Sequence, residues 1–367
     1  MQLRIHESLR TDLEAEVAKV VDAQIASRLG AKDDSIWGQD AKVEAAKRLG
    51  WIDSPKTSVD LIPEILKLRD HFRDLGVDRI VLCGMGGSSL APEVIAKNTG
   101  HEIVILDSTA PDQVLSAVRE LERTAVVVSS KSGATVETDS QKRAFESGYV
   151  AAGIDPTKRI VVVTDPGSPL DTASRADGYR VFNADPDVGG RYSALTAFGL
   201  VPAGLAGADI ASLLASASMV SFGLSEDSTD NPAIWLGVAL AATPGIGQSR
   251  DKFLIETDGL PGFGDWVEQL VAESTGKQER GILPVVVTGS APEIQDVPSD
   301  TIFIRFSDSI PGVEHMTFSG SLGELFLLWE YATAIAGYLM NINPFDQPDV
   351  ESAKIAARAL LDSPGVE

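Results

Sequence analysis

The sequence predicts an α/β protein in which two doubly wound parallel sheets follow an N-terminal helical segment. Short β-branched runs alternate with helical patterns along most of the chain, as in proteins whose parallel strands are joined by helices. The runs are almost continuously apolar, which is typical of strands covered on both faces. A Gly- and Ala-rich helical stretch from about residue 193 to 246 separates two such sets, so we expect two subdomains.

The elements are expected in the following order. The first 60 residues show a 3.6-residue period, with helices at 13–29 and 41–51 before the break at Pro55. In the first set, strands at 79–84, 102–107, 125–130 and 159–165 alternate with helices at 90–100, 111–121, 135–152 and 168–176. In the second set, a strand at 252–259 precedes a helix at 263–274, strands follow at 282–289 and 301–306, and long helices end the chain. The predicted units are a helical segment 1–55, a first subdomain 56–205 and a second subdomain 206–367.

The composition is that of a globular protein. With 367 residues, of which 44% are hydrophobic and 23% charged, the chain can bury a sizeable core. Its single cysteine, Cys83, lies in an apolar run, which excludes a disulfide framework and favours a buried thiol in a reducing compartment. No apolar stretch reaches the ~20 residues of a membrane span, and the N-terminus lacks the features of a secretory signal. We therefore predict a cytoplasmic protein with no membrane partner.

The net charge of −22 limits the ligands that the protein can bind. Nucleic acid is excluded as a partner, because phosphate backbones are bound by dense Lys and Arg surfaces. An anionic substrate would need a local cationic pocket that overcomes the repulsive overall field.

The first candidate loop, "GMGGSSLAPE" at 84–93, lies between a strand and a helix. Gly86 and Gly87 would let backbone N–H groups approach an oxyanion beside Ser88, at the positive end of the following helix. A tight turn with serine caps explains the same residues. The loop also half-resembles a dinucleotide fingerprint, but Ser89 stands where its third glycine belongs.

The second candidate loop, "SSKSGATVET", follows the third predicted strand of the same sheet. It places Ser130, Lys131, Ser132 and Thr135 where a helix begins. Capping accounts for one or two hydroxyl groups, whereas several beside a lysine favour a cradle for a phosphomonoester. We expect the two loops to converge on one anion, with Ser88 facing this second loop.

Three further stretches carry candidate chemistry. Arg191 follows two glycines, of which Gly190 allows close backbone approach, and a guanidinium suits planar oxyanions. Glu273 ends an apolar helix, where a carboxylate opposes the helix dipole, a placement that suits a proton-transfer base. Near the C-terminus, a turn leads into a helix that carries Lys354, which nothing local distinguishes from a surface lysine.

Together, these stretches resemble the glucose-6-phosphate isomerase family, whose members have the sugar-isomerase fold with flavodoxin-like subdomains. The matching segments are "GMGGSSLAP", "SSKSGATVET", "VGGRYSALTAFGL", "QLVAESTGK" and "NPFDQPDVESAK", in the family's order from residue 84 to 354. The chain is also similar to the isomerase half of transaldolase–isomerase fusions in "SIWGQDAKVEAAKRLGWID".

The resemblance implies an enzyme of glycolysis and gluconeogenesis that interconverts glucose 6-phosphate and fructose 6-phosphate without a metal or organic cofactor. It assigns Glu273 as the proton-transfer base, Arg191 as the stabiliser of a cis-enediolate and Lys354 as the ring-opening lysine. It assigns the substrate phosphate to these residues: Ser88, Ser130, Lys131, Ser132, Thr135 and, as a neighbour, Gln347. The chemistry agrees, since a positioned carboxylate can move the proton between C2 and C1 and an arginine can stabilise the developing charge.

The chain departs from the family at one position. The family usually has a histidine shortly after the glutamate, often reaching into a neighbouring subunit, and none follows Glu273 here. His315, in a late loop, is the candidate substitute for ring opening. The sequence therefore leaves open whether two copies of the chain form a homodimer with a shared active site.

Three other functions stay open at this point. A sugar-phosphate sensor would use the same loops without catalysis, although it would need neither Glu273 nor Arg191. A related phosphosugar isomerase would also accept mannose 6-phosphate. A dinucleotide enzyme would use the glycine loop, against the evidence of Ser89 and the hydroxyl-rich second loop.

Overall fold

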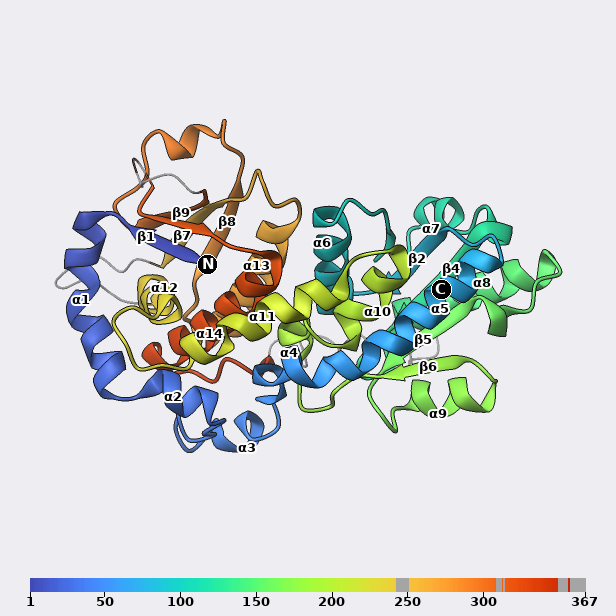
Figure 1. The fold of residues 1–367 in the computed structure, drawn as a ribbon, viewed down its shortest axis with the longest axis horizontal. Coiled ribbons are helices and arrows are strands. Elements are labelled where there is room, and N and C mark those ends of the chain that lie inside the picture. The colour runs from blue at the N-terminus through green and yellow to red at the C-terminus, as the bar shows by residue number, and fades with distance from the viewer. Residues whose placement is uncertain (242–250, 308–311, 313, 349–355, 357–367) are drawn as a thin grey trace.

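The structure is a computed structural model that describes residues 1–241, 251–307, 312, 314–348 and 356. Two five-stranded sheets stand side by side, and helices cover them and fill the space between them (Figure 1). Lys354 and the other residues after Pro348, apart from residue 356, lie outside the described residues.

The first sheet is entirely parallel. Its strands are β2 (Arg79–Gly84), β3 (Val104–Leu106), β4 (Thr124–Ser129), β5 (Ile160–Thr164) and β6 (Arg180–Asn183). They lie in the order β3-β2-β4-β5-β6, which is the flavodoxin-like order of a doubly wound sheet. Gly84 pairs with Ser129, so the loops that follow β2 and β4 begin side by side at the switch point of the sheet. The fold class predicted for this part is confirmed.

Both faces of the first sheet are buried because the strand residues alternate between them. Val81, Cys83, Val126 and Val128 pack with Phe145 of α8 on one side. The next residues along β2 and β4 join the main core on the other side. Helices α5, α6 and α10 pack together, while α7, α8 and α9 complete the coverage. Their bounds are α5 Ile62–Asp74, α6 Leu90–Asn98, α7 Pro111–Ala117, α8 Val136–Ala151, α9 Pro169–Ala176 and α10 Ala197–Ala206.

The second sheet contains two short strands that the periodicity did not predict, at 2–5 and 316–319. Its parallel strands are β7 (Lys252–Glu256), β8 (Leu283–Val287), β9 (Thr301–Phe306) and β10 (Met316–Ser319), and β1 (Gln2–Ile5) pairs antiparallel with β10. The order is β1-β10-β9-β7-β8. The N-terminal segment is therefore helical only after its first residues. A run of four residues is too short to show a period, and its partner is more than 300 residues away.

The remaining helices surround the second sheet and connect it to the first. Helix α14 is buried along most of its length and packs against α11, α12 and α13. The bounds are α1 Glu7–Asp22, α2 Ile25–Gly30, α3 Lys42–Ala45, α4 Ser54–Thr57, α11 Ile210–Leu224, α12 Pro232–Ala241, α13 Phe263–Thr275 and α14 Leu322–Leu339. The helix expected at 41–51 is shorter than predicted, because Leu49 forms a β-bridge with Val188 and Gly50 N–H donates to Asp187 O.

The predicted boundary near residue 205 falls at the end of α10, which packs on α5 and α6, just before α11, which packs on α14. The division into three units stays a prediction. Among the described residues, no helix has both the length and the apolar character required to cross a membrane.

Candidate active site

The glycines of the first loop let it press against two other elements. This loop forms a short 3-10 turn, η3 (Gly86–Ser88), and a second such turn, η6 (Gly190–Tyr192), lies against it. A β-carbon on Gly87 would lie only 2.3 Å from the carbonyl oxygen of Gly190. Gly86 has φ +59°, and a β-carbon there would lie 2.7 Å from Gln269 Nε2 of α13. Gly87 is therefore required for contact between loops of the protein itself, whereas Gly190 has open space where a side chain would stand.

Two hydroxyl groups of the second loop face each other at the start of α8. Ser130 is 4% exposed, and its Oγ lies 3.1 Å from Thr135 Oγ1. Thr135 is the N-cap residue of α8, yet its side chain makes no capping hydrogen bond. Capping therefore does not account for these hydroxyl groups, and they lie at the positive end of a helix of 16 residues. Ser132 differs, because it is exposed and its Oγ accepts a hydrogen bond from Ala134 N.

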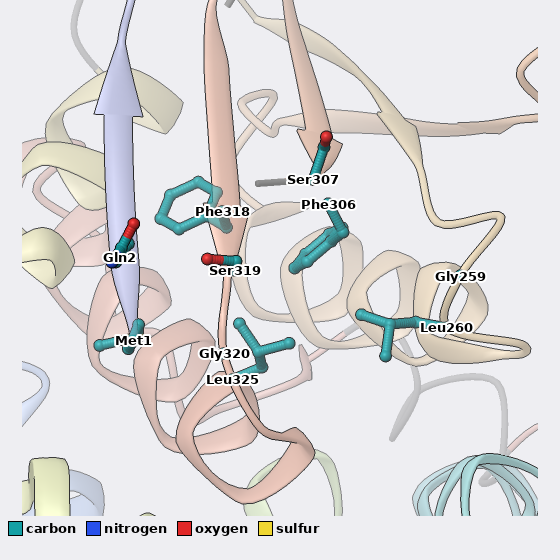
Figure 2. Close-up of a pocket in the computed structure, with 10 residues that line it drawn as sticks. All are labelled: Met1, Gln2, Gly259, Leu260, Phe306, Ser307, Phe318, Ser319, Gly320 and Leu325. Carbon is teal, nitrogen blue, oxygen red and sulfur yellow. The ribbon is translucent and has the colours of Figure 1, made fainter. Parts of the chain in front are cut away.

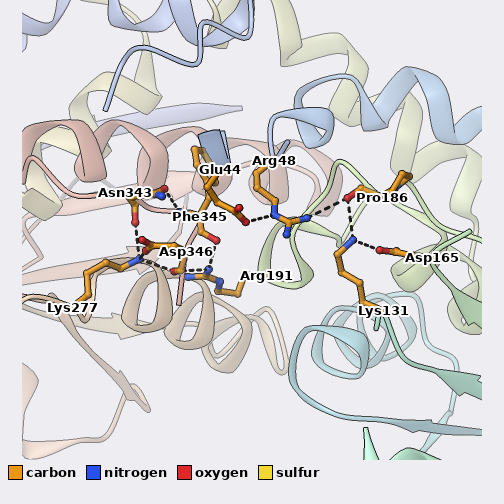
Figure 3. Close-up of polar contacts among 10 residues, drawn as sticks. All are labelled: Glu44, Arg48, Lys131, Asp165, Pro186, Arg191, Lys277, Asn343, Phe345 and Asp346. Carbon is orange, nitrogen blue, oxygen red and sulfur yellow. Dashed lines mark hydrogen bonds and ion pairs between the residues drawn. The ribbon is translucent and has the colours of Figure 1, made fainter. Parts of the chain in front are cut away.

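The lysine of this loop is already paired. Lys131 Nζ donates to Asp165 Oδ2 at 2.6 Å and to the carbonyl oxygen of Pro186 at 3.2 Å (Figure 3). Burial raises the pKa of Asp165, although the Lys131 ammonium opposes that shift. Arg48 also donates to the carbonyl oxygen of Pro186, at 3.2 Å, and brings a second cation that the sequence analysis did not single out. The ammonium of Lys131 thus lies between the loops that follow β4, β5 and β6 and shares its charge with Asp165.

Arg191 is buried and its guanidinium has a fixed orientation. It is 6% exposed, its Nη1 donates to Ser274 Oγ at 3.2 Å, and its Nη2 donates to the carbonyl oxygens of Phe345 and Asp346 at 3.0 and 3.2 Å. Its Nε lies 3.9 Å from Glu273 Oε1. The arginine thereby joins the loop that follows β6 to α13 and to the C-terminal turn.

Glu273 lies in the last turn of α13, as expected from the sequence. Its side chain is 23% exposed, so it is within reach of solvent while facing Arg191. Gln269, one turn earlier on the same face, donates from Nε2 to Glu273 Oε2 at 3.2 Å. One carboxylate oxygen therefore faces the arginine and the other faces the glutamine. The sequence analysis missed Gln269, although its position four residues before Glu273 on an amphipathic helix is a usable signal.

Two of the predicted C-terminal residues are less well defined. Gln347 is half-buried directly after Asp346, beside the turn that accepts from Arg191. Lys354 lies outside the described residues, so the structure does not place it. The segment between Asn343 and Asp346 is held by Lys277, a buried lysine that the sequence analysis passed over because the polar stretch "STGKQER" has the composition of an exposed loop.

His315 is held within the second sheet. Its N–H donates to the carbonyl oxygen of Phe303, its Nδ1 accepts from Phe303 N at 3.0 Å, and its carbonyl oxygen accepts from His6 N. These bonds fix the histidine between β9 and the start of the chain, whereas Glu273 lies on α13, which packs on β8 and α6. The described contacts do not draw His315 into the cluster around Arg191.

Predicted site residues with different chemical groups therefore lie between the two sheets. Glycine and hydroxyl loops come from the carboxyl end of the first sheet, and a carboxylate comes from α13 of the second. A separate cavity of about 410 Å³ lies at the carboxyl ends of β9 and β10 (Figure 2), but none of the residues that line it is a predicted site residue. Among the described residues, no group of three His, Cys, Asp or Glu side chains is placed to hold a metal ion.

The chain is similar in sequence to one protein family and to several known proteins. The family model of phosphoglucose isomerase matches residues 73–290. A probable glucose-6-phosphate isomerase of Haloarcula marismortui is 29% identical over 77% of this chain and 78% of its own length. A probable glucose-6-phosphate isomerase of Methanococcus maripaludis is 28% identical over 87% of this chain and 85% of its own length.

Two solved structures share the fold. A hypothetical protein from Thermus thermophilus has a TM-score of 0.81 at 23% identity, covering 99% of this chain and 100% of the other. A glucose-6-phosphate isomerase from Chlamydia trachomatis has a TM-score of 0.70 at 20% identity, covering 98% and 86%. At these identities the likeness is one of fold.

Proposed function

The chain belongs to the phosphoglucose isomerase family, and from this premise we propose that the cluster between its two sheets catalyses the interconversion of glucose 6-phosphate and fructose 6-phosphate. The relatives that bear the name glucose-6-phosphate isomerase support this activity. The observation that carries it within this chain is the position of Glu273 Oε1, 3.9 Å from Nε of the buried Arg191.

We propose that Glu273 transfers the proton between the two carbons. Glu273 removes the proton from C2 of the open-chain aldose, the C2–H electron pair forms the C1=C2 double bond, and the carbonyl pair moves to O1. Return of the proton to C1 and transfer of the O2 proton to O1, with formation of the C2=O2 carbonyl, give the ketose. One carboxylate serves both transfers, and its partial exposure suits a group that must meet a substrate.

In this proposal Arg191 stabilises the negative charge that develops on the enediolate oxygen. Its Nη1 and Nη2 groups are occupied by Ser274 and the C-terminal turn, whereas its Nε edge faces the carboxylate. A cation held in this manner needs no reorganisation when charge develops on the substrate.

The substrate phosphate is proposed to bind the hydroxyl loop. Ser130 and Thr135 present paired hydroxyl groups at the N-terminus of α8, and Ser88 lies on the adjacent loop. In this proposal the phosphate also lies near Lys131, Ser132 and Gln347. Such remote binding orients the sugar and supplies energy that the reacting carbons cannot. Lys354 stays the proposed ring-opening residue, and the position of His315 gives no support for the role considered for it.

The decisive experiment is a coupled assay in which purified protein converts fructose 6-phosphate to glucose 6-phosphate. Turnover supports the proposal, and binding of the sugar phosphate without turnover would identify a sensor instead. Mannose 6-phosphate in the same assay measures the alternative substrate. A rise of melting temperature with NAD would revive the dinucleotide enzyme.

We also propose that two copies of this chain associate through α11. This helix has no charged residue in a chain of net charge −22, and two of its exposed side chains, Met219 and Phe222, are 80% and 76% exposed. Its exposed residues form one stripe with small side chains at the start and large ones at the end: Ala211, Ser212, Ala215, Met219 and Phe222. A two-fold axis near the helix centre would set Phe222 on Ala211 of the second copy, a self-complementary contact between uncharged residues.

Light scattering tests this association. A dimer that Phe222→Glu converts to a monomer supports it, with Leu115→Glu as a control because Leu115 is a similarly exposed apolar residue on α7. A wild-type protein that is monomeric at tens of micromolar contradicts it.

A further inference from the structure

Lys277 owes its burial to a two-residue turn. After α13 ends, Lys277 and Arg280 form an antiparallel bridge, and the residues between them, Gln278 and Glu279, have φ of 55° and 58°. Two consecutive left-handed residues are the geometry of a type I′ turn, which reverses the chain tightly. The reversal places Lys277 against the C-terminal turn, and the residue is only 3% exposed.

All three protons of the Lys277 ammonium are in use. Its Nζ donates to the carbonyl oxygens of Asn343 and Asp346 at 2.6 and 2.7 Å, and to Asp346 Oδ1 at 2.5 Å (Figure 3). An ammonium group has three donors and no acceptor. Lys277 is therefore neither a free proton donor for ring opening nor a free cation for the phosphate, and its contacts define a different task.

The turn that Lys277 holds is the turn that orients Arg191. The carbonyl oxygen of Asp346 accepts from both Lys277 Nζ and Arg191 Nη2, and the neighbouring carbonyl of Phe345 accepts from the same Nη2. With Nη2 fixed by these two carbonyls and Nη1 fixed by Ser274, the Nε edge of the guanidinium faces Glu273. A shift of the turn would therefore rotate the arginine relative to the carboxylate.

The turn also has anchors that do not depend on Lys277. Phe345 N donates to Asn343 Oδ1, and the Phe345 ring packs edge-on against Trp37 with 4.8 Å between ring centroids. It packs against Tyr192 as well, at 5.4 Å. Loss of the lysine is therefore expected to loosen the turn without removing it from the core.

We propose that Lys277 is a positioning residue, which fixes the Asn343–Asp346 turn and through it the orientation of Arg191 toward Glu273. This inference rests on the isomerase activity proposed above. Because Lys277 acts through Arg191, its removal should lower the rate of the chemical step more than the affinity for substrate. It should also matter little once the guanidinium has already been lost.

A double-mutant cycle with Lys277→Met and Arg191→Lys tests the proposal. Methionine keeps the length of the side chain and removes the charge and all three donors. We expect Lys277→Met to lower kcat about 10–100-fold with KM changed less than about 3-fold, and to cost less than about 3-fold in the Arg191→Lys background. Equal fold losses of kcat in both backgrounds would overturn the proposal. A residue with a merely structural role would lower kcat by the same factor whether or not the Arg191 guanidinium is present.

Two further variants keep the test decisive. Lys142→Met is the matched control, since Lys142 is a largely buried lysine paired with Glu146 away from the site, and its kcat should stay within about 2-fold of wild type. If Lys277→Met does not fold, Asp346→Asn weakens the same anchor and should show the same non-additivity with Arg191→Lys. A wild-type protein with no isomerase activity would refute the proposed function, whereas an active wild type with additive losses would refute only the role of Lys277.

Discussion

Replacement of Glu273 by glutamine separates catalysis from structure most sharply. Glutamine keeps the shape of the side chain and can still accept a hydrogen bond from Gln269, but it cannot take a proton. Removal of a positioned base costs about 10²–10⁴-fold in rate, and because one carboxylate serves both transfers we expect the upper part of this range, about 10³–10⁴-fold. That loss corresponds to about 4–5.5 kcal/mol in the activation free energy.

The same substitution should hardly affect stability. Among the described residues the nearest ion-pair partner, Arg191 Nε, is 3.9 Å away and the Glu273 side chain is partly exposed, so the lost attraction is worth at most about 1 kcal/mol. Melting temperature should fall by no more than about 3 °C. A large fall in rate at nearly constant stability is the expected signature.

The measurement combines the coupled assay with exchange of the C2 hydrogen in D₂O, which reports proton abstraction without product release. Glu268→Gln is the matched control, because Glu268 is exposed and precedes Gln269 on the same helix. A Glu273→Gln protein that keeps a tenth or more of wild-type turnover, or an equal loss in Glu268→Gln, would remove Glu273 from its proposed role.

Three further predictions concern loop contact, phosphate binding and pH. Gly87→Ala should destabilise the protein by about 2–3 kcal/mol in urea unfolding, since its β-carbon would lie 2.3 Å from Gly190 O, whereas Gly189→Ala meets nothing within 4 Å and should be neutral. Ser130→Ala should lower kcat/KM about 10–100-fold through loss of one hydrogen bond to a charged phosphate, and unchanged kinetics would exclude Ser130 from the phosphate site. Glu330 is fully buried with no hydrogen-bond partner among the described residues, and burial raises its pKa well above 4.5. Its native state keeps a proton that the unfolded chain releases, so the free energy of unfolding should fall as pH rises above 4.5, by up to about 1.4 kcal/mol per pH unit. Glu330→Gln should remove this part of the slope above pH 4.5, and parallel profiles for the two proteins would show that the carboxyl group is not neutral in the fold.

The sequence was sufficient to predict four of the five strands of the first sheet, because their local signals agree. Runs such as Val126–Val128 and Val161–Val163 are apolar on both faces, and both are fully buried strands flanked by helices. The pairing of Gly84 with Ser129 then brings together the two loops that the sequence marks, as expected of neighbouring parallel strands. The short strands β1, β6 and β10 escaped prediction because four residues give no reliable period.

The site was less accessible to sequence analysis. The local sequence does not reveal that Lys131 is paired with Asp165. Asp165 follows a different strand and comes near Lys131 only in the folded sheet. The burial of Lys277 likewise depends on carbonyl groups about 66 residues later in the chain. Arg191 and Glu273 stood out from their local sequence and received their roles from the family resemblance, but their proximity depends on the packing of η6 against α13.

The position of β1 has a consequence for how the protein is made. The first sheet is built from one continuous stretch, residues 79–183, and can form once that stretch has left the ribosome. By contrast, Gln2 pairs with Ser319, so β1 cannot pair until a strand more than 300 residues later in the chain has been made. At about 5–20 residues per second, this interval lasts roughly 15–60 s. Throughout it the nascent chain carries a strand without its partner, so the second sheet is completed after the first.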